Sequence, residues 1–600
     1  MQKRTLVNHQ SKLYILGAIV GVVSGFVAIG FRLMILGISI AFSALPQAIG
    51  IWGWLLIPAA GGILVGFIVL NYAPEAKGHG VPEIIEAYAL RGGRIRFRVP
   101  LLKSLASAIC IGSGGSCGRE GPIAQIGGGV GSSIAVRLKL DTRVTKTLVI
   151  CGVASGISAT FNAPLGGTLF GIEVIGGGIV GFSIIPVIMS SVIATAIVDT
   201  LLGSQPSFQA PFFVMNNYME LGFYFMLGVL FGLLAVVWTR GFYKIEDFFE
   251  RLPIPKLAIT AVGGLIVGGL AVVILMMENS FGYMGAFKPG EPYFPAIMGV
   301  GYAFIDASLI GVVPLLLLAV LGVAKALATS VTLGSGGSGG VFAPTLFIGT
   351  AVGGAYGLLF STLFPTVIPE PMAYALVGMA ALFAGAGRAP ITCIVIIMEM
   401  TSDYSMILPL MIAVSSSFLI SSLIEGESIY TLKLARRGVH VRRGAYIGAL
   451  REAKAEHVMT KEPTLLNPDM TPEEVLAIVD ATQHTKFPVV DKNGLVVGCL
   501  ITEDLFRKPQ DESQELLVRD LMNPDFLHIA PNCTMDSVLQ EMLRRGEGHA
   551  VVVDPRIPNV MVGFITKADV LRAYDMAILR LQESGEPVES IDPLEALDVT

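Results

Sequence analysis

One twelve-residue phrase occurs twice in this chain of 600 residues. It reads IGSGGSCGREGP at residues 111–122 and LGSGGSGGVFAP at residues 333–344, an offset of 222. A second pair of segments, residues 151–175 and 377–401, aligns at an offset of 226. Two matches at nearly the same offset predict a chain built from two homologous halves.

Composition indicates where those halves lie. Hydrophobic residues make up 53% of the chain and charged residues 14%, and the mean hydropathy is +0.70, which is typical of a protein that crosses a membrane several times. We therefore expect an all-α polytopic membrane domain over residues 1–445, with an internal inverted repeat whose halves span about 13–245 and 255–430. Its glycine-rich segments predict broken helices, which are tolerated in a membrane where they line a cavity.

The repeated phrase itself suggests an anion site. In transport proteins, repeats broken by Gly and Pro commonly bring two half-helix N-termini to one central site, where backbone N–H groups and the helix dipoles attract an anion. Glycine-rich membrane helices can also simply pack closely. Close packing, however, does not require the same order of Gly, Ser and Pro twice. We therefore favour the anion site.

The two copies differ where chemistry can occur. The first copy carries Arg119 and Glu120 where the second carries Val341 and Phe342. A carboxylate can mimic an anion in a site made of N–H dipoles, and a proton can switch that mimicry off. The alternative is a structural ion pair, although adjacent helix residues such as Arg119 and Glu120 point in different directions. An acidic residue within a membrane is a candidate functional group.

The net charge changes near residue 450. Residues 1–450 hold 27 basic and 19 acidic residues, and residues 451–600 hold 14 basic and 27 acidic ones, giving net charges of +8 and −13. This contrast predicts a soluble cytoplasmic region appended to a membrane body. Basic clusters at residues 91–103 and 433–443 favour cytoplasmic faces, so we expect an integral membrane protein of the inner or plasma membrane with both termini in the cytoplasm.

The acidic region has a repeat of its own. Residues 498–504 (GCLITED) match residues 563–569 (GFITKAD), and we interpret each copy as a short apolar strand that turns into a Thr-x-x-Asp motif at the start of a helix. The region resembles a tandem pair of CBS domains, of the cystathionine-β-synthase type, which we place at 446–510 and, with the acidic tail, 511–600. The resemblance implies α/β structure and an adenine nucleotide (AMP, ADP or ATP) held by Thr502, Asp504, Thr566 and Asp569. The alternative is that these residues only cap helices.

The membrane part resembles the CLC chloride channels and chloride/proton antiporters over about residues 13–438. The signature segments are, in order, GHGVP at 78–82, GREGP at 118–122, FNAP at 161–164, GVFAP at 340–344 and SIYTLKLARRG at 428–438. The resemblance implies chloride as the transported ion, no required cofactor, and a homodimer in which each subunit has its own anion pathway.

The resemblance also assigns roles. Glu120 is the expected gate, whose carboxylate fills an anion site until it is protonated or displaced. The residues implied in anion binding are His79, Gly80, Arg119, Gly121, Val341, Phe342 and Tyr430. Of these, Val341 and Phe342 are expected to offer backbone N–H groups and Tyr430 its hydroxyl, although Tyr430 can also be read as an interfacial anchor.

Two positions depart from the family pattern. His79 stands where chloride-selective members usually have Ser, which leaves the preference among chloride, nitrate and other halides open; the alternative is a histidine that touches no ion. Val174 stands where antiporters carry the glutamate that relays protons internally. Its neighbour Glu173 points elsewhere around the helix, and the repeat mate of Glu173, Glu399, suggests that this pair has a structural role.

The predicted function is therefore a passive, glutamate-gated chloride channel with nucleotide-responsive regulation, because Val174 cannot carry a proton. A chloride/proton antiporter is the first alternative, and a nucleotide-sensing scaffold with a non-conducting membrane domain is the second. No nucleophile, base and orienting group cluster at a recognisable spacing, so we do not expect an enzyme. The six cysteines form no CxxC pair, so we expect neither a disulfide nor a metal site. We also expect no nucleic-acid partner.

Overall fold

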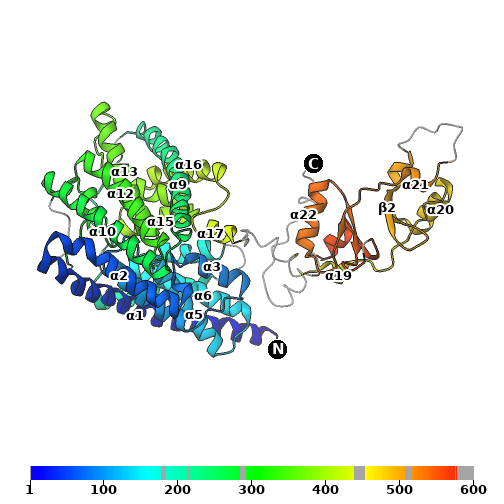
Figure 1. Cartoon of the computed structure of the whole chain (residues 1–600), viewed down its shortest axis with the longest axis horizontal. Helices are drawn as coiled ribbons and strands as arrows, with labels where there is room; N and C mark the ends of the chain where they lie inside the picture. Colours follow the sequence, from blue (N-terminus) through cyan, green and yellow to red (C-terminus); the bar gives the residue numbers. More distant parts are fainter. Residues whose placement is uncertain are drawn as a thin grey trace. The chain divides into compact units, whose positions relative to one another are not determined.

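The computed structural model describes residues 2–177, 184–204, 206–213, 215, 217–283, 292–437, 450, 453–506, 516–557, 559–573 and 576. The chain forms two compact units, Met1–Val441 and Arg442–Thr600. In the described residues, the first is built from helices joined by loops, and the second combines short strands with helices (Figure 1). Each unit is described by itself below.

The unit Met1–Val441 is called the membrane unit below, and its first half runs from α1 to α9. Its helices are α1 (Gln2–Ile49), α2 (Ile51–Asn71), η1 (Pro74–Ala76), α3 (Val81–Leu90), α4 (Arg98–Gly112), α5 (Glu120–Arg137), α6 (Thr142–Phe161), α7 (Pro164–Phe170), the π-helical turn η2 (Gly171–Ile175), α8 (Ile184–Leu202) and α9 (Glu220–Glu250). The second half consists of α10 (Lys256–Ser280), α11 (Tyr302–Leu309), α12 (Leu315–Gly334), α13 (Phe342–Leu363), α14 (Ala373–Gly387), α15 (Pro390–Thr401), α16 (Ile407–Ile424) and α17 (Thr431–Arg436).

Helix lengths fit a membrane with interruptions. Within the described ranges, nine helices are long and apolar enough to cross a bilayer, namely α1, α2, α6, α8, α9, α10, α12, α13 and α16. The apolar segments Pro164–Ile175, Ala373–Gly387 and Pro390–Thr401 are shorter than the roughly 20 residues that a bilayer requires. The outward faces carry large apolar side chains such as Trp52 and Val237. The expected polytopic helical domain with broken helices is confirmed.

The breaks recur at equivalent places in the two halves. Helix α6 ends at Asn162 and α14 ends at Arg388, and both residues adopt the left-handed conformation, with φ of 55° and 58°. In each half the chain then enters a short helix whose first residue is Pro164 or Pro390. A left-handed C-cap followed by a proline at the first helical position stops one helix and starts the next. The same local chemistry therefore builds both halves.

The second unit contains two small α/β domains. Its elements are α19 (Ala455–Val458), α20 (Pro472–Thr482), β1 (Lys486–Val490), β2 (Val496–Ile501), η3 (Thr502–Phe506), α21 (Val518–Leu521), β3 (His528–Ile529), α22 (Met535–Arg545), β4 (His549–Val553) and β5 (Met561–Thr566). Strands β1 and β2 pair antiparallel, while β4 pairs parallel with β3 and antiparallel with β5. Separate apolar cores lie under the two sheets. The predicted α/β tail is confirmed.

Candidate functional site

The two repeated loops meet in the membrane unit. The backbone N–H of Gly118 donates to the carbonyl of Gly340 (2.7 Å), and the N–H of Gly340 donates back to the carbonyl of Gly118 (2.6 Å). A Cβ atom on Gly340 would lie 2.7 Å from the backbone nitrogen of Gly121, so a side chain there would collide with α5. This close approach brings the N-termini of α5 and α13 together, where the first-turn N–H groups have no partner within their own helix.

Glu120 is the first residue of α5 and is only 1% exposed. One oxygen of its carboxylate, Oε2, accepts a hydrogen bond from the backbone N–H of Ala343 in the first turn of α13 (3.4 Å). The other oxygen, Oε1, accepts a hydrogen bond from the hydroxyl of Tyr302. The carboxylate of one half therefore lies at the helix N-terminus of the other half, which is the place and geometry that suit a bound anion.

Arg119 lies against the tyrosine of this arrangement. Its guanidinium lies 5.1 Å from the centre of the Tyr302 ring, a cation–π distance, and its Nη2 donates to the carbonyl of Thr160 (3.5 Å). The structure thus joins Arg119 to the tyrosine that holds Glu120. The predicted contact between Arg119 and an anion has no support in this geometry.

Aromatic side chains connect the other predicted anion-binding residues. The ring of Phe342 lies 4.4 Å from that of Phe383, the Phe383 ring lies 6.4 Å from that of Tyr430, and the Tyr430 ring lies 5.8 Å from that of His79. Phe342, Tyr430, His79 and Val341 are all buried. The structure brings these four positions into one region, which includes the N-terminus of α13, where Ala343 bonds Glu120.

The loop before α3 depends on glycine. Gly80, with φ of 84°, precedes the first residue of α3, and a Cβ atom there would lie 2.8 Å from the side-chain oxygen of Gln125. A Cβ atom on Gly121 would lie 3.0 Å from Gly340. Both glycines therefore allow backbones to approach closely, and their contact with an anion stays a prediction.

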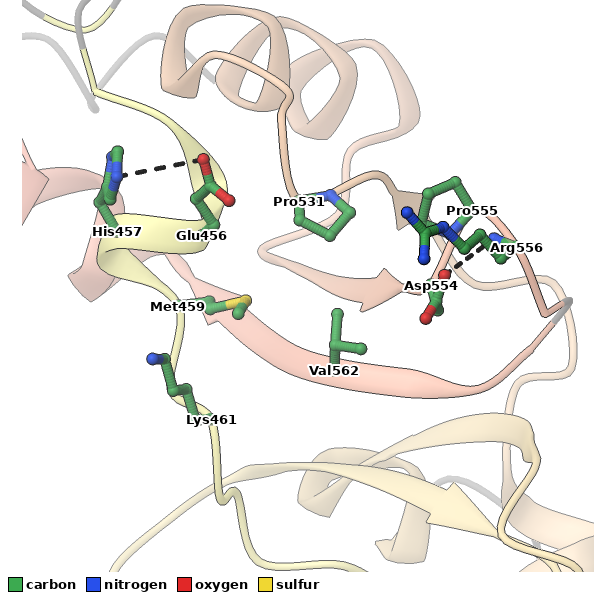
Figure 2. Close-up of a pocket in the computed structure, with 9 residues that line it drawn as sticks. All are labelled: Glu456, His457, Met459, Lys461, Pro531, Asp554, Pro555, Arg556 and Val562. Carbon is green, nitrogen blue, oxygen red and sulfur yellow. Dashed lines mark hydrogen bonds and ion pairs between the residues drawn. The ribbon is translucent and has the colours of Figure 1, made fainter.

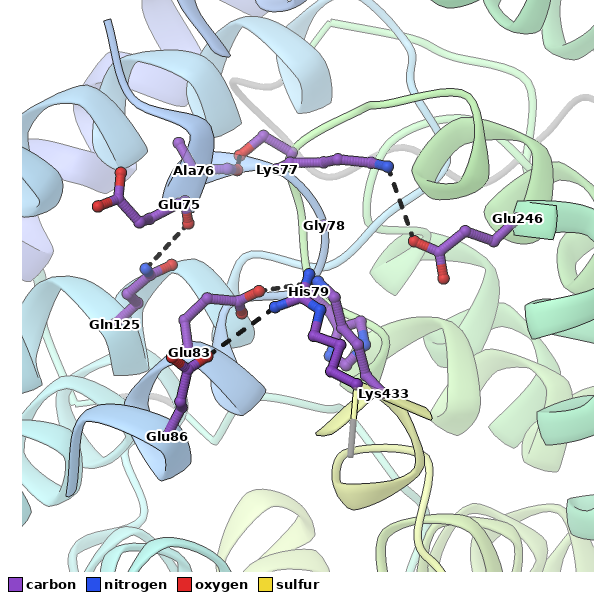
Figure 3. A network of polar contacts seen from close by, with 12 residues as sticks. Glu75, Ala76, Lys77, Gly78, His79, Glu83, Glu86, Gln125, Glu246 and Lys433 are labelled. Carbon is purple, nitrogen blue, oxygen red and sulfur yellow. Dashed lines mark hydrogen bonds and ion pairs between the residues drawn. The ribbon is translucent and has the colours of Figure 1, made fainter. Parts of the chain in front are cut away.

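His79 is 1% exposed and lies beside a buried ion pair (Figure 3). Its Nε2 is 3.4 Å from the hydroxyl of Tyr243, whose own proton is donated to the carbonyl of Ile429 (2.6 Å). Nε2 must therefore carry the proton that it shares with Tyr243, and Nδ1 is left as an acceptor without a partner among the described residues. The ammonium of Lys433, paired with Glu83 at 2.8 Å, borders the same loop. A neutral imidazole fits this site.

Two buried lysines were not predicted from the sequence. Lys103 on α4 and Lys325 on α12 are both 0% exposed. Lys103 donates to two carbonyls in the loop before α3 (3.0 and 2.7 Å), and Lys325 donates to two carbonyls in the loop before α11 (3.0 and 2.8 Å). Their offset of 222 is that of the repeated phrase, so the alignment of the halves contained the signal. Each lysine therefore holds a loop of its own half in place, Lys103 the loop before α3 and Lys325 the loop before α11.

Comparison with known proteins decides the family. The family model described as "Voltage gated chloride channel" matches residues 61–422, and the CBS domain model matches residues 455–511 and 518–575. The chain belongs to the voltage gated chloride channel family. Its membrane unit is thus a membrane transport domain for anions, and its C-terminal unit contains a tandem CBS pair.

Among sequence relatives of this family, the H(+)/Cl(-) exchange transporter ClcA of Vibrio parahaemolyticus is 32% identical over 433 residues, covering 70% of this chain and 89% of that protein. A ClcB-like protein of Ralstonia nicotianae, named for a chloride channel, is 33% identical over 400 residues, covering 66% and 88%. Among solved structures, a slow cyanobacterial Cl-/H+ antiporter is 26% identical with a TM-score of 0.61, covering 71% of this chain and 97% of that one. A eukaryotic CLC transporter, 20% identical, shares the fold over 94% and 98% with a TM-score of 0.61.

Val174 and Glu173 can now be compared with the family's proton relay. Val174 is buried in the π-helical turn η2, and its apolar side chain offers no proton site. The carboxylate of Glu173 accepts hydrogen bonds from the backbone N–H (2.8 Å) and the hydroxyl (2.6 Å) of Thr392, in the first turn of α15. Glu399 in turn accepts from the N–H of Gly166, in the first turn of α7 (2.6 Å). Glu173 of the first half thus caps α15 of the second half, and Glu399 of the second half caps α7 of the first. The predicted structural role of the pair is confirmed.

In the CBS pair, the two threonine–aspartate motifs are not equivalent, contrary to expectation. The first copy reads Thr-x-Asp, whereas the second reads Thr-x-x-Asp. Strand register shows the consequence, because Lys486 pairs with Ile501 in the first sheet and His549 pairs with Thr566 in the second. Ile501, not Thr502, therefore stands in the place of Thr566.

The second motif is locally well defined. Asp569 is buried, and its Oδ2 accepts hydrogen bonds from both the N–H (2.9 Å) and the hydroxyl (2.8 Å) of Thr566. This is the arrangement of a helix-capping pair, the alternative raised by the sequence. Thr502 donates its N–H to the carbonyl of Thr485 (2.9 Å) at the end of the first sheet.

Basic side chains lie near the second motif. The Nζ of Lys486 is 3.3 Å from the carbonyl of Gly548, which also accepts the backbone N–H of Lys567 (3.1 Å). Burial and the neighbouring Lys567 lower the pKa of Lys486, and burial followed by Lys486 lowers the pKa of His549. An anion at this place would relieve the repulsion between the two ammonium groups.

A cavity of about 590 Å³ lies elsewhere in the CBS pair (Figure 2). Val562, near the start of β5, lines it, whereas Thr566 and Asp569 follow the other end of that strand. Acidic and basic side chains both border it, so its charge gives no preference for an anion. Its lining residues are Glu456, His457, Met459, Lys461, Pro531, Asp554, Pro555, Arg556 and Val562. None of the four predicted nucleotide-binding residues is among them.

Proposed function

We propose that this protein exchanges chloride for protons across a membrane. The observation that carries the proposal is the position of Glu120, whose carboxylate occupies the N-terminus of α13 through Ala343. A carboxylate in an anion site can leave that site when it takes up a proton, so the same group can compete with chloride for the site when it is charged and carry a proton when it is neutral. The relatives named as H+/Cl− exchangers and antiporters support exchange over passive flow.

This proposal replaces the passive channel predicted from Val174. That prediction assumed that protons must pass through a titratable group at residue 174, and the valine there is buried among apolar neighbours. We propose instead that the inner proton route bypasses residue 174. Glu173 is engaged in capping α15, which favours a route that leaves the Glu173–Thr392 contact in place.

The test measures both ions together. Full-length protein in liposomes is given an outward chloride gradient, with the membrane potential clamped so that no passive proton leak is driven. We expect protons to move against their own gradient, with a fixed ratio between the chloride and proton fluxes. Chloride flux without proton movement would establish the passive channel instead, and the absence of any flux above that of empty liposomes would favour the scaffold alternative.

We further propose that the CBS pair binds an adenine nucleotide near Thr566 and Asp569. A threonine hydroxyl and N–H suit a phosphate, a carboxylate can accept two hydrogen bonds from ribose hydroxyls, and Lys486 and Lys567 add positive charge nearby. Because the first motif has a different spacing, we expect Asp569 to contribute more than Asp504.

Calorimetry on the full-length protein with AMP, ADP and ATP at millimolar concentration tests this site. Asp569→Ala should weaken binding about tenfold or more, the effect of losing hydrogen bonds to a charged acceptor, and Asp504→Ala should weaken it less. Asp525→Ala, at an exposed position, is the matched control. Absence of heat with all three nucleotides would reject the site. A bound nucleotide alters transport only if it prefers one gating state.

The homodimer, the cytoplasmic location of both termini and the ion preference set by His79 stay predictions. So does the kind of membrane in which the protein resides.

A further inference from the structure

We propose that Tyr302 is a positioning residue for the gate, and that its hydroxyl sets the pH range over which Glu120 leaves the anion site. The inference rests on the proposed role of Glu120. It begins from the contact in which the Tyr302 hydroxyl donates to Oε1 of Glu120 while Ala343 donates to Oε2. The buried carboxylate thus has one donor from α11 and one from α13.

The tyrosine ring is itself fixed in place. Tyr302 is the first residue of α11, after Gly301 with φ of 86°, a conformation that favours glycine. The Phe208 ring packs edge-on against it at 5.1 Å, and the Arg119 guanidinium lies over it at 5.1 Å. The ring packs against Arg119 and Phe208, whereas the hydroxyl bonds Glu120 and also interacts with Arg119. A phenylalanine would keep the ring contacts and lose the contacts of the hydroxyl, of which the one to Glu120 concerns the gate directly.

The hydroxyl acts mainly on one state of the gate. A phenol hydrogen bond to an ionised carboxylate is stronger than one to a protonated carboxyl, so the Tyr302 hydroxyl favours Glu120 charged and seated at α13. The other titratable or charged groups that face Glu120 are Arg119 next to it, Lys325 from α12 and Tyr430 before α17. All three side chains are retained in a Tyr302→Phe variant, in which Arg119 keeps its contact with the ring and loses its contact with the hydroxyl. Removing the hydroxyl therefore lets a proton release the gate at a higher pH.

The experiment compares wild type, Tyr302→Phe, Glu120→Gln and the double variant as full-length proteins in liposomes, with chloride flux measured from pH 4 to 8. We expect Tyr302→Phe to move the midpoint of the pH profile upward by about one to two units, which corresponds to a hydrogen bond to a charged group. In the Glu120→Gln background, the same substitution should leave the profile unchanged. An unmoved midpoint in Tyr302→Phe, or an equal shift in both backgrounds, would overturn the proposal.

Chloride binding in detergent, measured by calorimetry, gives a second readout. Chloride competes with the seated carboxylate, so a less firmly held Glu120 should make chloride bind about tenfold more tightly in Tyr302→Phe. Mere structural damage would weaken binding, and weaker or equal binding would therefore count against the proposal. Both readouts concern chloride, so they test Tyr302 even if protons prove not to be coupled. A wild-type flux that did not depend on pH would refute both the gate and its positioning residue.

Discussion

Glu120→Gln is expected to leave chloride flux in place while removing most of its pH dependence and its coupling to protons. Glutamine is neutral at every pH, so it cannot act as a tethered anion at the N-terminus of α13 or release itself by taking up a proton. Low pH should make the wild type resemble the variant. Flux and proton movement in liposomes between pH 4 and 8 measure both effects.

The control for this substitution is Glu250→Gln, which removes an acidic side chain that is largely exposed and paired with Lys77 at 2.8 Å. It should retain the wild-type profile. If Glu120→Gln kept that profile as well, the gate would lie at another residue and the hydrogen bond from Ala343 would be structural only.

Lys325→Met is expected to weaken chloride binding by about tenfold and to lower the stability of the membrane unit. The ammonium is fully buried and is bonded to two carbonyls of the loop before α11, so its charge acts through a medium of low dielectric and favours an anion at the centre. Methionine fills a similar volume but leaves two buried carbonyls of the preceding loop without a donor, which costs about 1–3 kcal/mol for each unsatisfied group. Calorimetric chloride titration and thermal unfolding in detergent measure the two effects.

Lys103→Met, in the equivalent position of the first half, should show the same pair of effects, whereas Lys256→Met at the exposed start of α10 should show neither. Unchanged chloride affinity in both buried-lysine variants would mean that these residues only hold the loops in place.

The sequence carried enough information to predict the centre of the membrane unit. A Gly/Ser/Pro phrase that recurs at a fixed offset indicates two similar turns, and the exchange of Glu120 for Phe342 between the copies marks the titratable position. The same offset relates Lys103 to Lys325, although lysine alone in an apolar helix gives no indication of its partners. These features could be predicted because they are local or are repeated.

Tyr302 could not be found in that way. It lies 182 residues from Glu120 along the chain, and only the packing of α11 against α13 brings its hydroxyl to the carboxylate. The contact of Arg119 with the Tyr302 ring could not be foreseen for a related reason, and its predicted role in anion binding stays a prediction. The unequal spacing of the two CBS motifs is visible in the sequence, and strand register adds that Ile501 occupies the position of Thr566.

The paired backbone hydrogen bonds between Gly118 and Gly340 have a consequence for the origin of the protein. Each half supplies one strand-like partner, one helix N-terminus and one carboxylate cap for the other, so a polypeptide with only one of the two membrane halves would leave the centre incomplete. We infer that an ancestor with one such half worked as a self-associated pair, in which two identical copies completed one another. After fusion the two halves could differ in sequence, so that the first half carries Glu120 where the second half carries Phe342.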